Sequence, residues 1–195
     1  MNQNNKIKIP LWRFIVPFLL QLIIILSIPS QSFYTYAFGE TIVIQTRPVD
    51  PYDLLRGYSQ TLRYDISDLN ELKQLPGGKD LEQAKTFYVI LKAPESQDQQ
   101  PPLPWIPSKI RIEKPQNLPD NEIAIAGTVE NSRWANYGLE TYYMPENIRE
   151  QINREISQLR QQSNRERSFV VEIKVDAQGN AIANSLWIGD RNYNF

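Results

Sequence analysis

An almost unbroken apolar run near the N-terminus constrains the fold of this chain more than any other feature. Residues 14–28 read FIVPFLLQLIIILSI, with only a proline, a glutamine and a serine interrupting the run. Together with Leu11 and Trp12 it covers about 18 residues, or roughly 27 Å as an α-helix, which is near the lower limit for crossing a bilayer core. The sequence therefore predicts two units, an N-terminal segment over residues 1–38 and a domain over residues 39–195.

The charges on either side of this run indicate its orientation. Residues 1–38 hold Lys6, Lys8 and Arg13, and the first acidic residue is Glu40. By the positive-inside rule, this asymmetry keeps the N-terminus in the cytoplasm and sends the rest of the chain across the membrane. We therefore expect a single transmembrane helix in the bacterial cytoplasmic membrane, followed by an extracytoplasmic domain.

An uncleaved anchor and a cleaved signal peptide both fit the segment, and the anchor fits better. A small-residue cleavage site exists at Ala37, but the neighbouring Tyr34 and Tyr36 are bulky and the site lies well beyond the apolar run. With Phe33 and Phe38, these tyrosines resemble the aromatic belt of a membrane interface. A secreted or periplasmic domain after cleavage is the alternative, and the charge asymmetry argues against a buried helix of a soluble protein.

Two absent residue types narrow the possible chemistry. The chain has no cysteine and no histidine, which excludes disulfides, thiol nucleophiles and a Ser-His-Asp triad within it. Only carboxylates, lysine, tyrosine or serine remain for catalysis, so an enzyme is disfavoured without being excluded. No cofactor or metal is predicted. With 21 basic and 22 acidic residues, the chain lacks the positive charge that nucleic-acid binding requires.

The pattern of residues 39–195 is mainly β. Alternating or β-branched segments recur between turn signals, and six to eight strands are expected. The resulting fold class is α+β, mainly β, with an antiparallel sandwich- or barrel-like body. The principal strand candidates are Thr41–Arg47, Tyr58–Ile66, Thr86–Lys92, Lys109–Lys114, Glu122–Glu130, Ser168–Val175 and Ala181–Ile188, with a hairpin turn at 176–180 between the last two.

Two helices and one loop complete the expected elements. Residues 68–75 predict a short helix with Asp68 as its N-cap. Glu146–Gln162 predicts an amphipathic helix that packs on a sheet, and a helix that binds a partner is the alternative. Residues 93–107 contain five prolines and predict a surface loop. The apolar stripe of the longer helix consists of Ile148, Ile152, Ile156 and Leu159.

The densest group of polar and charged residues is PVDPYDLLRGYSQTLRY, residues 48–64. Capping rules explain much of this density, because Asp50 suits an N-cap, Asp53 the N3 position and Gly57 a left-handed residue after the helix. The stretch therefore predicts a one-turn helix between two strands, in which Arg56 could form an ion pair with either aspartate.

Catalytic hypotheses use residues in or near the same stretch. Asp50 and Asp53 could act as a carboxylate pair in an envelope hydrolase. Ser59 with Lys85 or Lys92 could form a Ser/Lys dyad, although no spacing requires it. Asp50, Asp53, Asp65 and Asp68 could gather around a cation such as Ca²⁺, but they lack the spacing of a Ca²⁺-binding loop.

A periplasmic small-ligand-binding module is a further alternative. It would require a concave pocket lined by Tyr58, Tyr64 and Tyr142, where aromatic surface could hold a ligand. The structural explanation is that these tyrosines are core and rim residues of a β domain.

Several blocks of the sequence resemble the GDYXXLXY protein family. They are GETIVIQTRPVDPYDLLRG (39–57), GYSQTLRY (57–64), YGLETYYMPE (137–146) and FVVEIKVDAQGNAI (169–182). Gly57, Leu62 and Tyr64 match the motif after which the family is named. Tyr58 stands at its aspartate position and Ser59 at its first tyrosine position, so chemistry that depends on that aspartate is not expected here.

The resemblance implies a membrane-anchored, extracytoplasmic bacterial domain without an established activity. It further implies a non-catalytic accessory or binding role toward a multi-pass membrane protein. No catalytic residue is predicted. The residues predicted to take part in binding are Asp50, Asp53, Arg56, Gly57, Tyr58, Leu62 and Tyr64.

Overall fold

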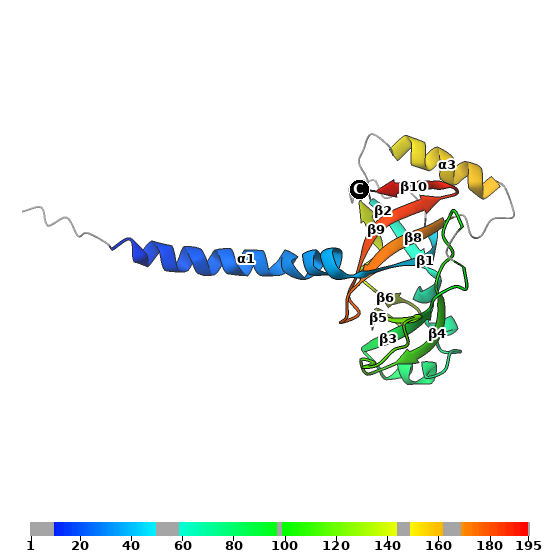
Figure 1. Ribbon diagram of the computed structural model, residues 1–195, viewed down its shortest axis with the longest axis horizontal. Helices are drawn as coiled ribbons and strands as arrows, with labels where there is room; N and C mark the ends of the chain where they lie inside the picture. The colour runs from blue at the N-terminus through cyan, green and yellow to red at the C-terminus, as the bar shows by residue number, and fades with distance from the viewer. Residues whose placement is uncertain (1–9, 50–58, 97–98, 144–148, 162–168, 195) are drawn as a thin grey trace, which may run out of the picture.

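The protein consists of a long N-terminal helix that extends away from a body of two antiparallel sheets (Figure 1). The computed structural model describes residues 10–49, 59–96, 99–143, 149–161 and 169–194. An α+β class with antiparallel sheets and an N-terminal helix is thereby confirmed.

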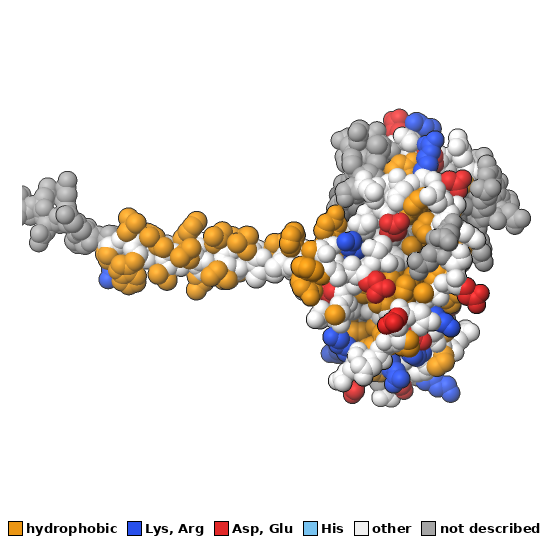
Figure 2. Space-filling model, viewed as in Figure 1, with side chains coloured by type: hydrophobic (Ala, Val, Ile, Leu, Met, Phe, Trp, Pro, Cys, Tyr) orange, Lys and Arg blue, Asp and Glu red, His pale blue; other side chains and the backbone are white. Residues whose placement is uncertain are grey.

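Helix α1 (Trp12–Phe38) contains Pro17 and Pro29 and presents apolar side chains to its surroundings along its length (Figure 2). Its large apolar residues are 40% to 74% exposed. No single helix in the described part of the chain is long and apolar enough to span a membrane. The segments Trp12–Ser27 and Pro29–Phe38, bent by 45°, meet the length and composition requirement together.

The larger sheet has six strands in the order β10-β9-β8-β1-β2-β7. Every neighbouring pair is antiparallel, and β1 is central because it pairs with β8 in its first half and with β2 in its second. The strands are β1 (Glu40–Val49), β2 (Ser59–Tyr64), β7 (Thr141–Tyr143), β8 (Phe169–Val175), β9 (Ala181–Ile188) and β10 (Arg191–Asn194).

The smaller sheet has four strands in the order β4-β3-β5-β6. Phe87, Val89 and Leu91 share one face of its inner strand β3 and are fully buried, and Ile90 on the other face is fully buried as well. Phe87, Val89 and Leu91 belong to a single hydrophobic cluster that also includes residues of the larger sheet. The strands are β3 (Thr86–Lys92), β4 (Ile106–Arg111), β5 (Glu122–Val129) and β6 (Ala135–Asn136).

Short helical elements fill the space between strands. Two 3₁₀ turns, η1 (Asp65–Ser67) and η2 (Gly78–Glu82), flank α2 (Leu69–Leu72). The predicted N-cap is confirmed, because the Asp68 carboxylate accepts the Asn70 N–H at 2.8 Å. Capping offsets the donors left unpaired at a helix start, which explains why this short helix begins at Leu69.

Helix α3 (Arg149–Gln161) packs on the larger sheet, as its apolar stripe predicts. Ile152 and Ile156 are buried, and Glu155 on the same helix bonds to Tyr193 and Arg191 of β10. The first residues of the predicted helix, together with Ile148, lie outside the described residues.

The number and limits of the strands differ in places from expectation. The described residues contain ten strands, more than the six to eight expected. The sequence does not reveal β6, β7 and β10, because they are too short to show a two-residue period. Strand β4 begins at Ile106, earlier than predicted. The end of the proline-rich segment is therefore not a surface loop: Trp105 is buried, and its N–H donates to the Val43 carbonyl at 2.8 Å.

Candidate functional site

Most of the residues predicted to bind a partner lie outside the described residues. Asp50, Asp53, Arg56, Gly57 and Tyr58 belong to this group, so the one-turn helix and the carboxylate pair stay predictions. The backbone of Leu62 lies in β2, opposite Pro48 of β1.

Tyr64 serves the packing of the motif region. Its side chain is 3% exposed, and its hydroxyl donates to the Leu139 carbonyl at 2.7 Å. In the opposite direction, the Tyr137 hydroxyl donates to the Ile66 carbonyl at 2.6 Å. Burial, followed by the charge of Glu140, raises the pKa of Tyr137 well above its ordinary value, so the Tyr137 hydroxyl stays a neutral donor.

These two bonds join blocks that the family resemblance singled out separately. Residues 57–64 and 137–146 are distant in sequence. Each block contributes a tyrosine whose hydroxyl donates to a backbone carbonyl two residues beyond the other tyrosine. Tyr137 also meets Phe87 edge to face, with 6.1 Å between the ring centres. The burial of Tyr64 argues against a ligand pocket lined by its ring.

A second feature is the connection between α1 and the sheets. Thr35, near the end of α1, is fully buried, and its hydroxyl donates to the Asp176 carboxylate at 2.7 Å. Asp176 begins the predicted hairpin turn between β8 and β9, and its other oxygen accepts the N–H groups of Gln178 and Asn180, each at 2.9 Å. Gly39 is the one residue between α1 and β1.

The hydrogen bonds around this turn favour the ionised form of the Asp176 carboxyl. Burial raises the pKa of its carboxyl, but the bonds from Asn180, Thr35 and Gln178 outweigh it, and the pKa is lowered overall. The carboxylate is therefore ionised at neutral pH. The turn also reaches the smaller sheet, where the Ala126 N–H donates to the Gly179 carbonyl at 2.9 Å. The turn that begins at Asp176 thus connects α1 with both sheets.

A lysine supports the same connection from β8. The Lys174 ammonium donates to the Tyr36 carbonyl at 2.7 Å and lies 5.0 Å from the centre of the Tyr36 ring. A cation near the last carbonyls of a helix is favourable, because these carbonyls carry partial negative charge. The sequence predicts the turn and the aromatic residues but not this connection.

A third feature is a group of two arginines around one indole, here called the Trp134 cluster. The guanidinium carbons of Arg63 and Arg133 lie 4.2 Å and 4.9 Å from the centre of the Trp134 ring. Arg63 belongs to the larger sheet, while Trp134 immediately precedes β6 of the smaller one. The indole is half-buried and both arginines are exposed.

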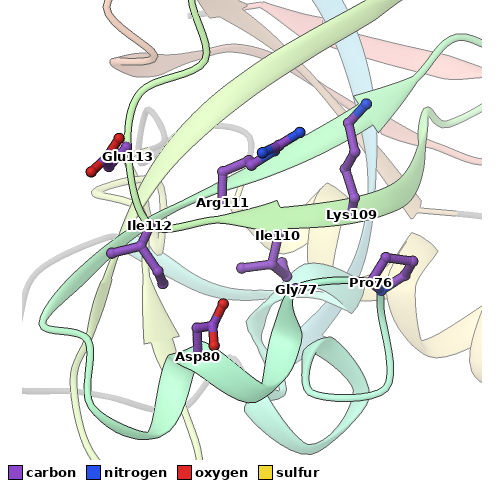
Figure 3. A pocket seen from close by; sticks show the side chains of 8 residues that line it. All are labelled: Pro76, Gly77, Asp80, Lys109, Ile110, Arg111, Ile112 and Glu113. Carbon is purple, nitrogen blue, oxygen red and sulfur yellow. The ribbon is translucent and has the colours of Figure 1, made fainter.

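One hollow in the described part of the chain, of about 490 Å³, is open to solvent and lies between β4 and η2 (Figure 3). Its polar groups are only partly available, because Lys109 pairs with Glu122 at 2.9 Å and the Ile110 N–H donates to the Pro76 carbonyl. Both charge signs line it, so it defines no ligand class. Its lining residues are Pro76, Gly77, Asp80, Lys109, Ile110, Arg111, Ile112 and Glu113.

The described ranges contain no group of side chains that could bind a metal ion. Among them no three acidic residues gather closely enough to hold an ion. Of the aspartates considered for a cation, Asp68 uses its carboxylate to cap α2.

The exposed helix, its buried connection and the two sheets define a class of protein: a helix-tethered α+β domain. Within that class the chain belongs to the GDYXXLXY protein family, whose model matches residues 21–186 and thus both α1 and the body. No curated protein and no solved structure matches the chain.

Proposed function

We propose that this protein is a membrane-anchored, extracytoplasmic accessory domain that binds a multi-pass membrane protein and catalyses no reaction itself. The observation that carries the proposal is the exposure of α1. An isolated helix with apolar side chains on all sides is unstable in water, whereas a bilayer removes that surface from water. The bent helix spans the membrane, and the sandwich-like body lies outside it.

The end of α1 supports this placement. Phe33, Tyr34, Tyr36 and Phe38 are about half to three-quarters exposed, although they adjoin the folded body. Aromatic side chains of this kind favour the boundary between hydrocarbon and headgroups. The single residue Gly39 then leads into β1, so the body sits directly at the membrane surface.

Thiol labelling in intact bacterial cells tests the topology. Because the chain has no cysteine, a single introduced thiol reports one position. A membrane-impermeant maleimide should label exposed Glu82→Cys in intact cells and Asn2→Cys only after lysis. The protein should also remain in membranes washed with alkaline carbonate. Release by that wash, or labelling of Asn2→Cys in intact cells, contradicts the anchor.

Crosslinking in native membranes tests the partner. A multi-pass protein should be recovered in stoichiometric amount with the full chain. Replacing residues 14–28 with leucines provides the matched control, because it keeps an anchor while removing side chains specific to α1. Recovery of the chain alone after crosslinking would argue against an accessory role.

A further inference from the structure

The arginines of the Trp134 cluster carry exposed charge without an acidic partner in the described part of the chain. Neither Arg63 nor Arg133 takes part in an ion pair there. Asp68 lies opposite Trp134 in a β-bridge, yet its carboxylate caps α2. Two like charges held near one ring produce a local positive potential, which favours an anion.

Hydrogen bonds hold the backbone of two of the three residues in place. The Asn131 side-chain oxygen accepts the N–H groups of both Arg133 and Trp134 at 2.9 Å. The Arg133 carbonyl accepts the Leu69 N–H at 2.9 Å, and the Trp134 carbonyl accepts the Glu130 N–H at 3.0 Å. The backbone at these two residues therefore loses little conformational entropy when a ligand binds.

Guanidinium chemistry selects the class of ligand. Each guanidinium presents a planar fork of N–H donors that matches a carboxylate or a phosphate. Contact with the indole stabilises the cation from the ring face and leaves its edge available for hydrogen bonds. The cluster therefore suits an oxyanion that approaches from solvent.

The position of the cluster decides between a lipid phosphate and a protein carboxylate. Arg63 pairs across the sheet with Arg47, and at roughly 3.3 Å per residue the strand from Glu40 to Arg47 is about 23 Å long. Strand β1 runs on from the end of α1, away from the helix (Figure 1). Each headgroup layer is only roughly 5–8 Å thick. An anchored body therefore holds the cluster beyond the lipid headgroups.

We propose that the Trp134 cluster docks a carboxylate-bearing segment of a partner protein outside the membrane. This assignment rests on the proposed function, because the anchor sets the distance between the cluster and the lipid. Aspartate or glutamate side chains in an extracytoplasmic loop of the partner meet Arg63 and Arg133. Such surface pairs act mainly on specificity and association rate.

An acidic peptide titrated onto the full chain in phosphatidylcholine nanodiscs tests the proposal. The probe is a blocked octapeptide of glutamate, and its glutamine counterpart is the uncharged comparison. Nitrogen-15 labelling of the tryptophans gives indole signals from four residues, and Trp134→Phe assigns the relevant one. The glutamate peptide should shift the Trp134 signal, with an effect that weakens as salt rises.

Arginine variants give the decisive comparison. The double variant Arg63→Gln/Arg133→Gln should bind the peptide about tenfold more weakly, since two exposed ion pairs are lost. Arg111→Gln is the matched control, because Arg111 is also exposed but has no aromatic partner among the described residues, and it should bind as the unchanged chain does. A double Arg→Lys variant that keeps the indole signals dispersed shows that the fold tolerates changes at both positions.

Three results would overturn the docking site. They are equal affinity of the double glutamine variant, equal binding of the glutamine peptide, and a shift of the Trp134 signal on exchange of the nanodisc lipid for phosphatidylglycerol without peptide. The last result assigns the cluster to lipid. Failure of the anchor is distinguished separately, because thiol labelling reports topology whether or not the peptide binds.

Discussion

At the scale of single residues, Tyr64 illustrates how a residue of the family motif can serve packing. The Tyr64 ring was a candidate for ligand binding, yet its hydroxyl satisfies the Leu139 carbonyl inside the core. The sequence predicts that Tyr64 lies in a strand and allows it to be a core residue, and the structure places it buried at the end of β2. The sequence could not identify the acceptor, because residues 64 and 139 are related only through the tertiary fold.

Removing the Tyr64 hydroxyl should therefore destabilise the body without affecting α1. Tyr64→Phe leaves the Leu139 carbonyl without this donor, which we expect to lower the free energy of unfolding by about 1–2 kcal/mol. Urea unfolding of the full chain in micelles, followed by tryptophan fluorescence, measures the change. Tyr88→Phe is the control, since that half-buried hydroxyl makes no hydrogen bond within the described residues. Equal stability of the two variants would contradict the structural role of Tyr64.

The Asp176 carboxylate should make the stability of the folded chain depend on pH in a defined direction. Its pKa is lower in the folded than in the unfolded chain, so its contribution is fully present above about pH 4, the unfolded pKa of aspartate, and is lost as pH falls further. Asp176→Asn should be less stable than the unchanged chain at pH 7, and the difference should shrink below pH 4. Unfolding curves at pH 7, 5 and 3 measure it. A difference independent of pH would contradict this account.

At the scale of secondary-structure elements, long periodic segments were predictable and short ones were not. The apolar run and the hairpin around residues 176–180 follow from local patterns, and the structure confirms both as elements. Strands β6 and β7 have two and three residues, and they exist because β5 and β2 offer hydrogen-bonding partners. Such strands leave no periodic signal in the sequence.

Helix α3 offers a test of an alternative that its sequence left open, namely that it binds a partner instead of the sheet. Ile152 is fully buried, so Ile152→Ala should lower the free energy of unfolding by about 2–4 kcal/mol. Gln158→Ala, on the exposed side of the same helix, should change it by less than about 0.5 kcal/mol. Chemical unfolding of both variants measures these changes in the free energy of unfolding. Equal stabilities would indicate that α3 does not dock on the sheet.

At the scale of the whole molecule, the direction of α1 depends on contacts that no local pattern predicts. Thr35 and Asp176 are 141 residues apart, and the local sequence around each gives no sign that they are in contact. Because Gly179 of the same turn bonds to Ala126, one polar contact relates the helix to the smaller sheet as well. A free linker after α1 would let the body tumble relative to the helix, whereas this arrangement fixes the orientation of the body relative to α1.

Loss of the Thr35 hydroxyl should therefore loosen the body relative to the helix. Thr35→Val keeps the volume of the side chain but removes its hydrogen bond to Asp176, and we expect a broader distribution of distances between α1 and the smaller sheet. Spin labels at Leu22→Cys and Thr128→Cys, both exposed positions in a chain without other cysteines, allow pulsed electron paramagnetic resonance to measure that distribution in nanodiscs. Thr41→Val, at an exposed position of β1, is the matched control and should leave the distribution unchanged. If Thr35→Val gave the same width as this control, the remaining contacts of Lys174 and Gly39 would suffice to orient the body, and the hydroxyl would contribute to stability alone.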